Sequence, residues 1–114
     1  MIVSVVIPVY NEIGTLAKIV ARVQNSPILT QIILVDDCST DGSRELVQTL
    51  AADEGIEAVL HEANRGKGAA LRSGFAAATG DVVLVQDADL EYDPGDYSRL
   101  LAPIEDHRAD VVYG

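Results

Sequence analysis

Short apolar runs alternate along this chain with segments in which apolar residues recur at helical spacing. The runs are rich in branched aliphatic residues and cover residues 3–9, 32–35, 58–60, 82–85 and 110–113. They are continuous rather than alternating, which is typical of strands that are buried on both faces of a parallel sheet. We therefore predict a buried strand at each of these positions.

Between the runs, apolar side chains repeat at spacings that give a helix one apolar face. These stripes are Leu16, Ile19, Val20 and Val23; Leu46, Val47 and Leu50; Leu71, Phe75 and Ala78; and Tyr97, Leu100, Leu101 and Ile104. Ser39-Thr40-Asp41-Gly42 and Asp93-Pro94 indicate helix starts, and Gly80 indicates a helix end. The order β-α-β-α-β-α-β-α-β predicts an α/β fold with a mostly parallel sheet and helices on both faces.

Composition narrows the class of protein. A chain of 114 residues is at most one domain, and its 48% hydrophobic content argues against disorder. The formal net charge of −10 argues against a nucleic-acid partner, although a metal ion or a local basic cluster can still hold an anionic ligand. Cys38 is the only cysteine, so an intramolecular disulfide is impossible and a reducing compartment is expected.

The sequence also predicts the cellular location of the protein and the extent of its domain. No apolar run approaches the roughly 20 residues that span a bilayer, and the first residues lack the basic region and cleavage site of a signal peptide. We therefore expect a cytoplasmic location, with membrane association only through parts outside residues 1–114. Because Gly114 directly follows an apolar strand, we expect one domain over residues 1–114 that is truncated there.

Polar clusters follow several of the predicted strands, at the sheet edge where ligands of open α/β sheets bind. They are Pro8-Val9-Tyr10-Asn11-Glu12, Asp36-Asp37-Cys38-Ser39-Thr40-Asp41-Gly42 and Asp87-Ala88-Asp89-Leu90-Glu91. Each cluster alone could be an ordinary turn. Together on one edge they predict a ligand site, and carboxylates one residue apart suit a hard cation such as Mg²⁺ or Mn²⁺.

The run Asn64-Arg65-Gly66-Lys67-Gly68 precedes a predicted helix that carries Arg72. A Gly-rich turn at a helix start can bind an anion through backbone N–H groups, and Lys67 adds a charge. An ordinary solvated helix start is the alternative. The run is not a Walker loop, because no Ser or Thr follows Lys67, and it is not a dinucleotide fingerprint, because Leu71 stands where the third glycine is required.

Other phosphate chemistries fit the order of the motifs less well. A receiver domain pairs its acids after the first strand, whereas Asp36 and Asp37 follow the second. A haloacid-dehalogenase-like phosphatase needs Asp-x-Asp on the first strand with Thr or Val two residues later, where this chain has Glu91. A nucleotidyltransferase of related architecture needs a Gly-rich N-terminal loop, which residues 8–12 replace. A motif counts only in its structural context, so we set these classes aside.

Taken together, the motifs resemble those of the family-two glycosyltransferases, inverting enzymes with the GT-A fold and its Rossmann-like nucleotide-binding half. The branch to which the chain is most similar is the dolichol- or polyprenyl-phosphate mannosyl- and glucosyltransferases. The likeness extends over essentially the whole chain. It is carried by Val5-Val6-Ile7-Pro8-Val9-Tyr10-Asn11-Glu12, Ile33-Leu34-Val35-Asp36-Asp37-Cys38-Ser39-Thr40-Asp41-Gly42, Asn64-Arg65-Gly66-Lys67-Gly68 and Asp87-Ala88-Asp89.

The resemblance implies a role for each matching position. Asp37 hydrogen-bonds the base, and Asp89 is the catalytic residue beside the donor diphosphate. The implied nucleotide-binding residues are Pro8, Tyr10, Glu12, Asp37, Lys67, Asp87 and Ala88, with Arg72 as a further contact. The implied ligands of Mg²⁺ or Mn²⁺ are Asp87, Asp89 and Glu91. Glu91 stands where this branch often has Gln, so it supplies a third carboxylate or indicates another branch.

The resemblance further implies transfer of a hexose, with inversion, from a nucleotide-sugar donor of the GDP-mannose or UDP-glucose type to a polyprenyl or dolichyl phosphate. The cation would act as a Lewis acid on the leaving diphosphate. In the family the acceptor site lies in the later half, so residues 1–114 are expected to be the donor- and metal-binding half, inactive alone, working at the cytoplasmic face of a membrane. A homo-oligomer is compatible with this. The alternative is a non-catalytic nucleotide- or protein-binding module with the same fold.

Overall fold

The computed structural model describes residues 2–26, 30–88 and 111–113. Within them, helices and strands alternate as the hydrophobic pattern predicts. In chain order they are β1 (Val3–Val9), α1 (Leu16–Gln24), β2 (Thr30–Asp36), α2 (Ser43–Leu50), β3 (Ile56–Leu60), α3 (Lys67–Ala77), β4 (Val82–Val85) and β5 (Val111–Tyr113). The stripe at residues 97–104 and the helix start at Asp93-Pro94 lie outside the described residues.

The strands form one sheet in the order β3-β2-β1-β4-β5, and each neighbouring pair is parallel. β1 lies between β2 and β4, so that Val5 is in register with Ile32 on one side and Leu84 on the other. The carboxyl ends of these strands therefore open at the same edge of the sheet. The predicted parallel α/β fold is confirmed.

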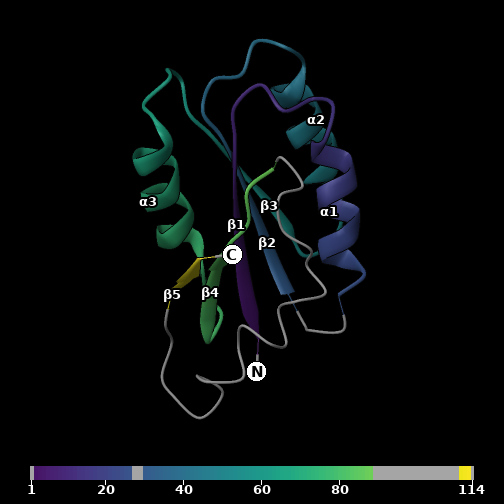
Figure 1. Ribbon diagram of the computed structural model, residues 1–114, viewed down its shortest axis with the longest axis vertical. Helices are drawn as coiled ribbons and strands as arrows, with labels where there is room; N and C mark the ends of the chain where they lie inside the picture. The colour runs from purple at the N-terminus through teal and green to yellow at the C-terminus, as the bar shows by residue number, and fades with distance from the viewer. Residues whose placement is uncertain (1, 27–29, 89–110, 114) are drawn as a thin grey trace.

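Helices cover both faces of this sheet, with α1 and α2 on one side and α3 on the other (Figure 1). Alternate residues of β1 consequently enter different cores. Val5 and Ile7 pack in the core that contains α1 and α2, whereas Val6 packs with Ala70 of α3 in the second core. Burial on both faces explains why the strand sequences are continuously apolar.

The predicted apolar faces of α1 and α2 are confirmed. The α1 stripe at Leu16, Ile19, Val20 and Val23 is buried, and in α2 Val47 is buried while Leu46 and Leu50 pack partly buried against the same core. α2 begins where the sequence indicates, because Asp41 Oδ1 accepts hydrogen bonds from the backbone N–H and the hydroxyl of Ser43. In the described ranges, no helix is long and apolar enough to cross a membrane.

The predicted stripe of α3 is wrong in part. Its buried residues are Ala69, Ala70 and Gly74, whereas Leu71 and Phe75 are only partly buried and Ala78 follows the helix. The reason is that α3 lies too close to the sheet for larger side chains to enter the contact. Small residues form the buried face of α3, and a prediction based on large apolar residues does not detect them.

Gly80 does not end α3, which stops at Ala77. Instead, Gly80 permits a close approach to the start of β1. A Cβ at this position would lie 2.7 Å from the carbonyl oxygen of Ile2 and 2.8 Å from the backbone nitrogen of Ser4. The glycine is therefore required by packing against β1 rather than by the helix end.

Candidate functional site

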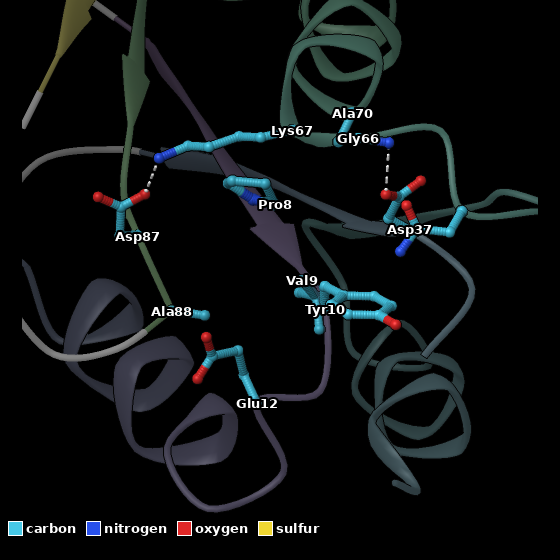
Figure 2. A pocket seen from close by; sticks show the side chains of 11 residues that line it. Pro8, Val9, Tyr10, Glu12, Asp37, Gly66, Lys67, Ala70, Asp87 and Ala88 are labelled. Carbon is cyan, nitrogen blue, oxygen red and sulfur yellow. Dashed lines mark hydrogen bonds and ion pairs between the residues drawn. The ribbon is translucent and has the colours of Figure 1, made fainter. Parts of the chain in front are cut away.

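A pocket of about 490 Å³ opens at the carboxyl edge of the sheet (Figure 2). It collects side chains from the loops after β1, β2 and β4 and from the start of α3. Its lining is Pro8, Val9, Tyr10, Glu12, Asp37, Asn64, Gly66, Lys67, Ala70, Asp87 and Ala88. The residues implied to bind nucleotide are all in this lining, with the exception of Arg72. A pocket of this volume is in the range that holds a small-molecule ligand or cofactor.

The loops after β1 and β2 are joined by hydrogen bonds at the pocket rim. The bonds run from Asn11 N to Ser39 Oγ (3.0 Å), from Glu12 N to Ser43 Oγ (2.9 Å), from Ile13 N to Asp41 Oδ2 (3.2 Å) and from Thr40 N to Asn11 Oδ1 (2.8 Å). Asn11 adopts a φ of 54°, a left-handed conformation that asparagine tolerates better than most residues. These contacts fix the segment that presents Tyr10 and Glu12.

The carboxylate of Asp41 is stabilised by the same contacts. The hydrogen bond from the Ser43 hydroxyl is the main reason that the pKa of Asp41 lies below its ordinary value. Burial, the second largest effect, acts to raise this pKa, and the backbone N–H groups of Ser43 and Ile13 act with the Ser43 hydroxyl to lower it. Asp41 is therefore ionised where it joins the two loops.

Asp37, at one side of the pocket, is almost completely buried, with 4% of its surface exposed. Its Oδ1 accepts hydrogen bonds from His61 Nδ1 (2.9 Å) and Arg65 N (2.9 Å), and its Oδ2 accepts one from Gly66 N (2.8 Å). Burial acts to raise the pKa of Asp37, but the hydrogen bonds from His61, Arg65 and Gly66 outweigh it and hold the pKa below its ordinary value.

These contacts revise the expectation for the Gly-rich turn. The backbone N–H groups of Arg65 and Gly66 bind an anion, but that anion is the carboxylate of Asp37 in the same chain. Gly66 adopts a φ of +95°, which favours glycine at this position. One residue later, the positively charged Lys67 side chain lines the pocket.

Asp36, directly before Asp37, forms the buried support of the loop. Its side chain is fully buried, and its Oδ2 lies 2.9 Å from Arg44 Nη1. The same oxygen accepts hydrogen bonds from the backbone N–H groups of Cys38 and Ser39, both at 3.2 Å. Among the described residues, Asp36 Oδ1 has no hydrogen-bond partner. Asp36 therefore shapes the turn that presents Asp37, and depends on Arg44 for its counter-charge.

The opposite side of the pocket carries Lys67 and Asp87, as Figure 2 shows, with Pro8 between them and Asp37. Lys67 Nζ lies 2.8 Å from Asp87 Oδ1, and the side chains are 52% and 19% exposed. Next to Asp87 in the chain, the carbonyl oxygen of Ala88 accepts a hydrogen bond from the Thr15 hydroxyl. The start of α1 thus holds the segment that follows β4.

Of the expected metal ligands the structure describes only Asp87, because Asp89 and Glu91 lie outside the described residues. Within residues 2–26, 30–88 and 111–113, no three or more Asp, Glu, His or Cys side chains converge on a metal position. Asp87 has the oxygen chemistry and the partial exposure that suit Mg²⁺ or Mn²⁺. Arg72 is exposed and is not part of the pocket lining.

Several residues of the site were not among the expected ones. Val9, Asn64, Gly66 and Ala70 line the pocket, and the motif that contains Asn64 and Gly66 was the available signal for two of them. His61 contacts Asp37 without lining the pocket. Its position directly after β3, at the same sheet edge as Asp37, is the signal that could have found it.

Solved structures with the same fold include S. aureus TarS 1–349 in complex with UDP and in complex with UDP-GlcNAc. The TM-scores are 0.79 and 0.78, each at 24% sequence identity over 94% of this chain and 33% or 32% of the other. These likenesses establish the fold. Both superpositions agree with the parallel α/β architecture described above.

Curated relatives include the undecaprenyl-phosphate 4-deoxy-4-formamido-L-arabinose transferase of Aeromonas hydrophila, 45% identical over 88% of this chain and 32% of the relative. The protein of the same name from Yersinia enterocolitica is 43% identical over 97% of this chain and 39% of the relative. The chain thus spans about a third of the length of these relatives. Residues 4–114 match the family model described as "Glycosyl transferase family 2", and this chain therefore belongs to glycosyl transferase family 2.

Proposed function

We propose that this chain is the donor-binding part of a glycosyltransferase that transfers a sugar from a nucleoside-diphosphate sugar to a polyprenyl phosphate at the cytoplasmic face of a membrane. Its family and the names of its relatives, which are undecaprenyl-phosphate sugar transferases, support this proposal. The sugar in those names is 4-deoxy-4-formamido-L-arabinose. The alternative donor is a nucleotide-activated hexose of the GDP-mannose or UDP-glucose type.

The observation that carries the proposal is the layout of the pocket. One side holds the buried acceptor Asp37, and the other side holds the charged pair Lys67 and Asp87 (Figure 2). Tyr10 also lines the pocket and is 47% exposed, so its ring offers a flat apolar surface to a bound molecule. A nucleoside diphosphate has the matching sequence of groups, namely a base with N–H donors, a sugar ring and a charged diphosphate.

The diphosphate would lie at the side of Lys67 and Asp87. Lys67 supplies a positive charge there, which reduces the repulsion between an anionic ligand and a chain of net charge −10. Asp87 would hold Mg²⁺ or Mn²⁺ together with Asp89 and Glu91, and the cation would stabilise the negative charge that grows on the leaving diphosphate.

None of the residue roles implied by the resemblance is that of a general base, and the proposed phosphate acceptor does not need one. A phosphate monoester is already ionised near neutral pH, so its oxygen can attack the anomeric carbon without prior removal of a proton. The side chains of this pocket are then required to bind and orient the donor and to stabilise the leaving group. They are not required to activate the acceptor.

The test is a calorimetric titration of the chain with UDP and with GDP, in the presence and absence of Mn²⁺. We expect binding that depends on Mn²⁺ and that is lost in Asp87→Asn and in Asp89→Ala. Asp53→Asn, at an exposed carboxylate after α2, is the matched control and should bind like the wild type. If the wild-type chain binds neither nucleotide, or binds equally well without Mn²⁺ and without Asp87, the proposed donor site is wrong.

A further inference from the structure

The carboxylate of Asp37 is held by a side chain that lies outside the pocket. His61 is 6% exposed, and its Nδ1 lies 2.9 Å from Asp37 Oδ1. On the other side of the ring, Nε2 lies 2.8 Å from the Ser73 hydroxyl of α3. An ionised carboxylate has no hydrogen to donate, so Nδ1 carries the hydrogen of this contact, while Nε2 forms the hydrogen bond with the Ser73 hydroxyl. The ring is therefore fixed at both of its nitrogen atoms.

These contacts leave Asp37 with acceptor capacity on the pocket side. A carboxylate has about four acceptor positions, two on each oxygen. In the described part of the chain, His61 and Arg65 donate to Oδ1 and Gly66 donates to Oδ2. A remaining position on Oδ2 can accept from a ligand, because Asp37 lines the pocket.

We propose that His61, anchored by Ser73, is a positioning residue that orients the Asp37 carboxylate so that Oδ2 accepts a hydrogen bond from the N–H edge of a nucleobase. This inference rests on the proposed function, because it assumes that the pocket binds a nucleotide. A site holds its geometry only when the side chains behind it are themselves fixed. Without His61, the Asp37 carboxylate can rotate and release the backbone N–H groups of Arg65 and Gly66.

The same geometry indicates which class of base the pocket takes. A carboxylate accepts hydrogen bonds and donates none. Uracil and guanine present a ring N–H on their pairing edge, whereas cytosine and adenine present an acceptor at that ring nitrogen and donate only through the exocyclic amino group beside it. An Asp37 oxygen placed opposite the ring nitrogen would therefore meet a donor in uracil and guanine and a lone pair in cytosine and adenine. The pocket should therefore prefer uridine and guanosine nucleotides to cytidine and adenosine nucleotides. UDP and CDP are the sharpest pair of probes, since their bases are nearly the same size.

The test compares His61→Asn with His61→Leu, each titrated with UDP and CDP in the presence of Mn²⁺. The amide nitrogen of Asn can replace Nδ1 as a donor, whereas Leu fills similar space without a donor. We expect His61→Leu to lose roughly tenfold or more in UDP affinity and most of its preference over CDP, because a hydrogen bond to a charged group is lost. His61→Asn should retain both. A UDP/CDP ratio that is unchanged in His61→Leu overturns the proposal.

A measurement without nucleotide separates this inference from the proposed function. Carboxyl-carbon NMR of the free chain follows the titration of Asp37 directly. We expect the pKa of Asp37 to rise in His61→Leu and to stay low in His61→Asn; equal titration in all three chains overturns the positioning role. If the wild type binds neither nucleotide, the donor site and base recognition are both wrong, and the Asp37 titration still decides whether His61 positions the carboxylate. Ser73→Ala, with a smaller effect in the same direction, replaces His61→Leu if that variant does not fold.

Discussion

Gly74 on α3 lies directly against Val6 on β1, so closely that a Cβ at Gly74 would come 2.3 Å from Val6 Cγ1. Non-bonded carbon atoms do not approach this closely without displacement, so the bare backbone of α3 at Gly74 packs directly against the Val6 side chain of β1. This contact sets the depth at which α3 lies on the sheet. It therefore also sets where Gly66 and Lys67, at the start of the helix, reach the pocket.

The first prediction concerns this contact. Gly74→Ala should lower the free energy of unfolding by about 1–3 kcal/mol, because the added methyl group forces α3 away from β1. Gly68→Ala is the control in the same helix, since its Cβ would meet only Arg72 Nη1 at 3.5 Å. That change should raise stability by about 0.5–1 kcal/mol through helix propensity. Urea unfolding measures both, and equal effects would contradict the prediction.

The second prediction concerns the ion pair between the fully buried Asp36 and the partly exposed Arg44. Arg44→Met should cost about 3–5 kcal/mol in unfolding free energy, because it leaves a fully buried carboxylate without its counter-charge. Combining it with Asp36→Asn should recover part of that loss. Arg22→Met, at an exposed position in the last turn of α1, is the control and should change stability by less than about 0.5 kcal/mol. Costs that simply add in the double variant would contradict the prediction.

The third prediction concerns stability in acid. The pKa of Asp37 is lower in the folded chain than its ordinary value, so the folded state holds the ionised form more strongly than the unfolded state does. This contribution is present above the ordinary range of an Asp pKa and is lost as pH falls below about 4. Asp37→Asn should be less stable near neutral pH and lose less stability on acidification. Urea unfolding between about pH 3 and pH 7 compares the two chains; parallel curves would exclude this role for Asp37.

The fourth prediction concerns the contact of Thr15 with Ala88. Thr15→Val keeps the side-chain shape and removes the hydroxyl that holds the segment after β4. We expect Mn²⁺-dependent affinity for UDP to fall roughly threefold to tenfold, which is the loss typical of one neutral hydrogen bond. Thr49→Val is the control, because its hydroxyl bonds the Glu45 carbonyl on the exposed side of α2. Equal effects of the two substitutions on UDP binding would argue against the contact.

The sequence predicted the strands well where both faces of the sheet are covered. Val3–Val9 and Val82–Val85 have the bounds expected from their continuous apolar runs. β2 extends beyond its apolar centre at both ends, to Thr30 and Asp36. Backbone pairing with β1 continues at these two ends although their side chains are polar. Hydropathy alone therefore cannot predict the full length of the strand.

The site was predicted less completely, for a related reason. The pocket lining could be expected because ligands bind at the carboxyl ends of parallel strands, and Pro8, Asp37 and Asp87 all follow such ends. The support behind the lining was missed, although the position of His61 directly after β3 offered one signal for it. His61 reaches Asp37 only because β2 and β3 are paired, and Ser73 reaches His61 only because α3 packs on that face. Contacts between residues of separate elements do not produce a regular spacing that could be recognised in the sequence.

The hydrogen bonds between the loops after β1 and β2 also affect how a pocket of this kind can diverge in evolution. Each loop uses groups of the other: the Asn11 backbone depends on the Ser39 hydroxyl, and the Thr40 backbone depends on the Asn11 side chain. A substitution accepted in one loop therefore demands a matching one in the other. A changed preference for the nucleotide-sugar donor should therefore arise through joint changes in both loops rather than through substitutions at isolated positions.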